Sequence, residues 1–146
     1  MIHFFIEDVS FDPAVLEATP NWLLQVANIH FQSIDIVNYI FCSDQYLLQI
    51  NQQHLNHDYF TDIITFDLRE DNAQPIESDI FISTERVLEN SAQMSTSFLA
   101  ELLRVMVHGI LHLLGFDDHS ENDRQIMRTL EEEYLKLYFT QFHPSL

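Results

Sequence analysis

The segment HGILHLLGFDDH, residues 108–119, places two histidines four positions apart and ends its apolar run at a glycine. Helix residues four apart lie on one face, about one turn apart, so the imidazoles of His108 and His112 can reach a single ion. Gly115 favours a left-handed helix end, which turns the chain back and brings three candidate third ligands toward the pair. Those candidates are Asp117, Asp118 and His119. The segment predicts a divalent-metal site, with zinc as the expected metal.

Three protein ligands would leave one tetrahedral position open, which is typical of a catalytic rather than a structural zinc. In zinc proteases with the HExxH motif, a glutamate general base directly follows the first histidine. Gly109 occupies that position here, so glutamate-assisted peptide hydrolysis is disfavoured. Without a metal, His108 and His112 would have to bond to neighbouring carbonyls or water. Their nearly all-aliphatic surroundings favour the metal.

The histidine pair falls in an apolar segment that predicts a central, buried helix. Residues 95–97 (Ser-Thr-Ser) can open this helix, and it is expected to run to residue 114. After the glycine, Ser120 followed by Asp123 predicts a capping box at the start of a last helix.

The rest of the chain predicts a mixture of strands and helices. Apolar and β-branched runs predict four strands, at residues 2–7, 34–42, 62–68 and 79–83, the last two forming a hairpin around a loop with Pro75. Helices are expected from Thr19 (as N-cap, before Pro20), from Ser43 to residue 55, and over residues 84–94. The pattern indicates one α+β domain over residues 1–146.

The amino-acid composition restricts the kinds of protein that this chain can be. The 146 residues are 47% hydrophobic, enough for a core without disulfides, and Cys42 is the only cysteine. No apolar run approaches a bilayer span and the start lacks the basic region of a signal peptide, so we expect a cytoplasmic protein with no membrane contact.

The chain has 23 acidic and 6 basic residues, a net charge of −17. This disfavours autonomous nucleic-acid binding and suits a bound cation or a basic partner, although solubility alone also explains such acidity.

Several segments together resemble one family. HGILHLLGFDDH is similar to the HGxLHLxGYDH signature of the YbeY family of metal-dependent endoribonucleases. Residues 61–66 (TDIITF) resemble the family's TDVLSF strand, residues 78–83 (SDIFIS) its GDIxIS strand, and Ile50-Asn51 its LN pair. The resemblance covers residues 49–130 in the correct order.

The resemblance implies a zincin-like α+β fold, with a mixed four-stranded sheet, about five helices and a groove leading to the metal. It implies a single-strand-specific endoribonuclease with one zinc ion per chain, acting in 16S ribosomal RNA processing, maturation and ribosome quality control. The implied partners are ribosomal RNA and basic ribosomal or ribosome-associated proteins, with no nucleotide cofactor. Two rivals stay open: a metal-dependent hydrolase of another substrate, such as a zincin-like peptidase, and a non-catalytic ribosome-assembly factor with a structural zinc.

The third metal ligand departs from the family pattern. The family's third histidine lies ten residues after the first, and that position holds Asp118, with His119 one step later. Either Asp118 is the ligand, or the turn carries one extra residue and His119 binds. The spacing to Met127 matches the family without a gap and favours Asp118. An aspartate ligand would make the metal a weaker Lewis acid than three imidazoles do.

The substrate groove departs from the family as well. The family's phosphate-neutralising arginine falls on Leu55, so only His54 or His57 could replace it in part, and Ser78 stands in place of a glycine.

Proton transfer and groove residues can also be proposed from the sequence. The candidates for proton transfer are Asp117, Asp62 and, where it is not a ligand, His119. Asp117 could instead hold a ligand histidine, and Asp62 could cap a strand. The residues expected along the substrate groove are Thr61, Thr65, Phe66 and His54.

Overall fold

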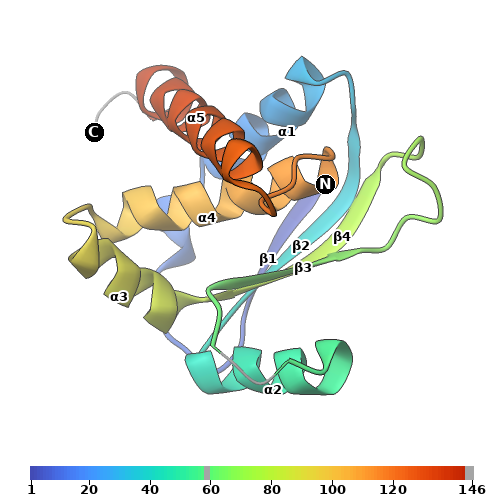
Figure 1. Cartoon of the computed structure of the whole chain (residues 1–146). Coiled ribbons are helices and arrows are strands. Elements are labelled where there is room, and N and C mark those ends of the chain that lie inside the picture. The colour runs from blue at the N-terminus through green and yellow to red at the C-terminus, as the bar shows by residue number, and fades with distance from the viewer. Residues whose placement is uncertain (58–59, 144–146) are drawn as a thin grey trace.

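Four strands form one mixed sheet in the computed structural model, which describes residues 1–57 and 60–143 (Figure 1). The strand order is β1-β2-β4-β3; β2 runs parallel to β1 and β4, whereas β3 is antiparallel to β4. The predicted hairpin is therefore confirmed. The strands are β1 (Ile2–Ile6), β2 (Ile34–Cys42), β3 (Ile63–Asp67) and β4 (Ile76–Ser83).

Five α-helices surround this sheet, so the α+β fold is confirmed. In Figure 1, α4 crosses one face of the sheet with α5 above it, and α2 lies on the opposite face. The α-helices are α1 (Thr19–Ile29), α2 (Asp44–Leu55), α3 (Thr84–Gln93), α4 (Phe98–Leu113) and α5 (Glu121–Leu137), with a 3₁₀ turn at Pro13–Leu16 and a π-helical turn at Tyr138–Phe142.

Helix α4 is the central buried helix that its apolar sequence predicts. Leu102, Met106 and Ile110 are fully buried and belong to the main core, which also contains Tyr39 of β2. The Tyr39 hydroxyl donates a 2.8 Å hydrogen bond to the carbonyl of Met106, so even the polar end of this side chain is satisfied inside the core. Among the described residues, no single helix could cross a membrane by length and apolarity.

Side-chain caps mark the starts of three helices. The hydroxyls of Ser43 and Ser97 accept the amide hydrogens of Tyr46 and Ala100, so α2 and α4 begin at serine N-caps. Helix α5 begins with the predicted capping box of Ser120 and Asp123.

Two predicted boundaries are wrong. Thr19 does not cap α1: it is the first helical residue, and its hydroxyl donates to the carbonyl of Leu16 at 2.8 Å. Strand β4 begins at Ile76 rather than at residue 79, because Ile76 already pairs with Ile34 of β2 and its amide donates to the carbonyl of Ser33.

Candidate metal centre

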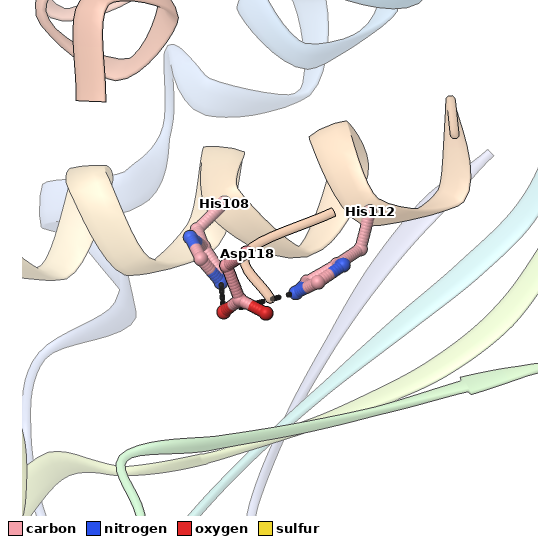
Figure 2. Close-up of side chains that lie close together, drawn as sticks. All are labelled: His108, His112 and Asp118. Atoms are coloured by element: carbon pink, nitrogen blue, oxygen red, sulfur yellow. Dashed lines mark ion pairs between the residues drawn. The ribbon is translucent and has the colours of Figure 1, made fainter. Parts of the chain in front are cut away.

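Helix α4 and the turn that follows it bring two imidazoles and one carboxylate together (Figure 2). The Nε2 atoms of His108 and His112 lie 3.7 Å and 3.6 Å from Oδ2 of Asp118. The three potential ligand atoms all lie within 4.8 Å of one another, the only such group of three or more among residues 1–57 and 60–143. Two imidazole nitrogens and a carboxylate oxygen are donors that zinc takes at catalytic sites, so these residues fit a bound metal.

The glycine turn delivers Asp118 to the histidines. Gly115 has φ +103°, the left-handed conformation that its lack of a Cβ permits. The amide of Gly115 donates to the carbonyl of His112, and that of Phe116 donates to the carbonyl of Leu111, both at 3.0 Å. These two bonds form a Schellman motif, which satisfies the last carbonyls of α4 while it reverses the chain.

The structure places Asp118, and not His119, beside the histidine pair. The Asp118 side chain is partly buried, whereas His119 is exposed at the edge of the cleft and lies outside the ligand group. Arg124 holds the turn, since its Nη1 donates to the carbonyls of both residues at 3.4 Å and 3.2 Å. The ungapped reading of the motif therefore agrees with the fold.

His112 is electrostatically suited to a metal. Burial lowers the pKa of His112, and the neighbouring His108 lowers it further, while the carboxylates of Asp118 and Asp117 oppose the shift. A lowered pKa keeps the imidazole neutral, the form with a free lone pair for metal binding.

A buried carboxylate on α5 contacts the other histidine. Nδ1 of His108 lies 2.6 Å from Oε2 of Glu131, and the Glu131 side chain is only 4% exposed. The sequence offers Asp117 as a possible carboxylate partner of this kind, but Asp117 is exposed and Glu131 makes the contact. Glu131 was not anticipated, because it lies on another helix and no local pattern connects it to the motif.

The metal-site residues open into a cleft of about 560 Å³ between α4 and β3. The predicted groove residues Thr61 and Thr65 line it, as do Asp62, His57 and Leu55.

Phe66 and His54, also expected in the groove, lie elsewhere. Their rings contact each other at 6.0 Å between centroids, and Phe66 packs against Phe81 in the smaller core that includes Leu47 of α2. Successive side chains of a strand face opposite sides of the sheet. Because Thr65 faces the cleft, its neighbour Phe66 faces α2. The expectation that Phe66 and His54 line the groove is therefore wrong.

Asp62 is the unusual acid of the cleft. Burial raises its pKa, although Arg104 and His108 nearby oppose the shift. It also lines a smaller hollow of about 160 Å³ with His108, Asp118 and Arg104. A partly buried carboxyl with a raised pKa beside a metal site is suited to proton transfer near neutral pH.

No lysine or arginine lines the larger cleft among the described residues. Its ionisable lining consists of the carboxylates of Asp62, Asp67 and Asp118 and the imidazoles of His57, His108, His112 and His119. The cleft is thus acidic, as is the whole chain.

A mixed sheet flanked by a helix with two histidines four residues apart, and a candidate third ligand after a glycine turn, is the arrangement of the zincin-like class of metal sites. The family model described as Endoribonuclease YbeY matches residues 4–138. The chain belongs to the YbeY family.

Its relatives cover most of the chain. It is 48% identical to Endoribonuclease YbeY of Flavobacterium psychrophilum, over 81% of this chain and 83% of the relative. It is 44% identical to Endoribonuclease YbeY of Cytophaga hutchinsonii, over 93% of this chain and 94% of the relative. Among solved structures, the solution structure of TM1509 from Thermotoga maritima superposes with a TM-score of 0.72 at 26% identity, covering 99% of this chain and 93% of that one.

Proposed function

We propose that this protein is a single-strand-specific, metal-dependent endoribonuclease that acts in the processing of ribosomal RNA, including 16S RNA, in the cytoplasm. The observation that carries the proposal is the convergence of His108, His112 and Asp118 at a cleft of about 560 Å³, in a chain of the YbeY family whose relatives are named endoribonucleases. A cleft of this size is typical of sites that enclose a small ligand or part of a larger one.

Zinc is the metal we propose, one ion per chain. His108, His112 and Asp118 would hold it, and the contact of Glu131 with the far side of the His108 ring is the usual support of a zinc-binding histidine. A zinc ion held there would supply Lewis-acid stabilisation of negative charge that develops on phosphate oxygens.

Asp62 is the proton-transfer group of the proposed mechanism. Its carboxyl lines the same cleft as the three ligands, and its raised pKa makes it a more effective base near neutral pH than an ordinary aspartate. Asp62 would accept the proton of the nucleophilic hydroxyl, whether from water or from the RNA 2′-hydroxyl. Asp117, the other candidate from the sequence, is exposed and absent from the cleft lining, which favours Asp62.

The acidic cleft is poorly suited to bind the phosphates of RNA without a partner. Leu55 stands where the family has an arginine, and lysine and arginine are missing from the described cleft lining. We therefore propose that basic ribosomal or ribosome-associated proteins present the RNA, since phosphate affinity depends on cationic side chains. The peptidase and assembly-factor alternatives have no comparable support, because the relatives are named endoribonucleases.

The test is cleavage of single-stranded ribosomal RNA segments by zinc-loaded protein, with and without added ribosomal proteins. The variants His108→Ala, His112→Ala and Asp118→Ala are expected to lose activity at least about 100-fold, as is chelator-treated protein. His54→Ala is the matched control, because His54 is exposed and outside the cleft. If fully zinc-loaded protein leaves these RNAs intact in both conditions, the nuclease proposal is wrong.

A further inference from the structure

A buried chain of charged side chains runs from the middle of α4 to the metal site. Nε of Arg104 donates to Glu101 at 2.9 Å, and its Nη2 forms a second, shorter bond to the same carboxylate. Nη1 of Arg104 donates to Oε1 of Glu131 at 3.0 Å, and Oε2 of Glu131 lies 2.6 Å from Nδ1 of His108. The network therefore links α4 to α5 and ends on a candidate metal ligand.

The two carboxylates of this network are among the most buried charges of the protein. The side chains of Glu101 and Glu131 are 1% and 4% exposed, and that of Arg104 is 27% exposed. Burying a carboxylate is strongly unfavourable unless its oxygens find donors. Both oxygens of Glu131 are committed, one to the guanidinium and one to the imidazole.

The chemistry of the contact fixes the state of the His108 ring. A carboxylate only accepts hydrogen bonds, so Nδ1 of His108 must be the donor. In the neutral ring, the form that binds a metal, Nε2 then carries the lone pair, and Nε2 is the atom that faces Oδ2 of Asp118. Among the described residues, no corresponding carboxylate bonds Nδ1 of His112.

We infer that Glu131, held in place by Arg104 and Glu101, is the positioning residue of the metal site. It fixes the tautomer and the ring orientation of His108, so that Nε2 is presented to the metal. The competing explanation is an ion pair that only fastens α5 to α4. In that case only the bond from Arg104 to Glu131 would contribute to the structure, and the contact of Glu131 with His108 would have no effect on metal binding.

Zinc affinity separates these explanations. Glutamine at position 131 replaces one of the two acceptor oxygens with an NH2 donor, so either Arg104 or His108 would face a donor in place of its present acceptor. Glu131→Gln is expected to weaken zinc binding about 10- to 100-fold, as measured by competition with a chromogenic chelator. The matched control is Glu132→Gln, a change of the same chemistry on an exposed neighbour, for which we expect wild-type affinity.

A second measurement needs no variant. Nitrogen-15 NMR of the imidazoles in the wild-type protein is expected to show the Nδ1–H tautomer of His108 without zinc, and coordination through Nε2 with zinc. This readout keeps the test decisive if Glu131→Gln does not fold. Coordination through Nδ1 of His108, or unchanged zinc affinity in a folded Glu131→Gln protein, would overturn the inference.

The inference rests on the metal site of the proposed function but not on the reaction. Both measurements read metal binding and ring state rather than RNA cleavage. A protein that binds zinc through Nε2 of His108 and loses affinity on Glu131→Gln, yet cleaves no RNA, would refute the nuclease proposal and leave the role of Glu131 intact.

Discussion

A Cβ atom at Gly109 would lie 3.1 Å from Cδ1 of Ile80. It would also lie 3.2 Å from Cδ1 of Ile63 and 3.3 Å from Oγ1 of Thr65, so α4 rests on the sheet at the residue that follows its first histidine. Zinc proteases carry a glutamate at this motif position. Here a side chain at position 109 would have to displace the side chains of Ile80, Ile63 and Thr65.

Restoring the protease glutamate should therefore damage the fold. We expect Gly109→Glu to lower the free energy of unfolding by about 3 kcal/mol or more, because it overpacks the interface and buries a carboxylate. Gly109→Ala adds only the Cβ atom. Its gain of about 1 kcal/mol in helix propensity offsets part of the cost of overpacking, so we expect it to lose less stability than Gly109→Glu. Urea denaturation measures both variants, and a Gly109→Glu protein as stable as Gly109→Ala would contradict this packing argument.

The third ligand can be assigned by paired substitutions. We expect Asp118→Ala to weaken zinc binding at least about 100-fold, since it leaves only two protein ligands, and His119→Ala to change it less than about threefold. Chelator competition gives both affinities. The opposite ranking would mean that the turn rearranges to bring His119 to the metal.

Zinc should stabilise the folded protein. A ligand that binds only the folded state at 100 times its dissociation constant adds about 2.7 kcal/mol to the free energy of unfolding. Thermal unfolding with zinc and with chelator is expected to show a clear rise in Tm that disappears in His112→Ala. An equal rise in that variant would point to zinc binding elsewhere.

Asp62 should make the metal-free protein less stable as the pH rises. Burial raises its pKa in the folded state above the ordinary value of 3.8, which the unfolded chain keeps. Below that value the carboxyl is protonated in both states and has no effect. As the pH rises through the interval between the two pKa values, ionisation penalises the folded state.

Asp62→Asn removes this penalty. We expect the variant, in chelator, to be more stable than wild type at pH 7 and equal to it at pH 3, with reduced RNA cleavage in the zinc form. Urea unfolding at the two pH values provides the measurement. A variant that is less stable at pH 7 would show that the ionised carboxylate is stabilised by Arg104 and His108 instead.

The sequence predicted those parts of the site that depend on local geometry. The spacing of His108 and His112, the stop at Gly115 and the capping box at Ser120 each follow from the periodicity or dihedral preference of a few neighbouring residues. The choice of Asp118 as the third ligand also depended on the spacing of the family motif. These features share a short stretch of chain, so no tertiary information was required.

The remaining parts depend on packing between distant elements. The contact of Glu131 with His108 exists only because α5 docks on α4. For Phe66, the alternation of side chains along a strand could have shown that it cannot share a face with Thr65. Thr19 failed as a predicted cap because the preceding 3₁₀ turn offers the carbonyl of Leu16 to its hydroxyl.

The order of elements along the chain has a consequence for biosynthesis. All four strands and the three candidate ligands precede α5 in the sequence. All four strands are therefore synthesised before α5, the helix that carries Glu131. The contact between Glu131 and His108 can form only after α5 has been made and has docked on α4.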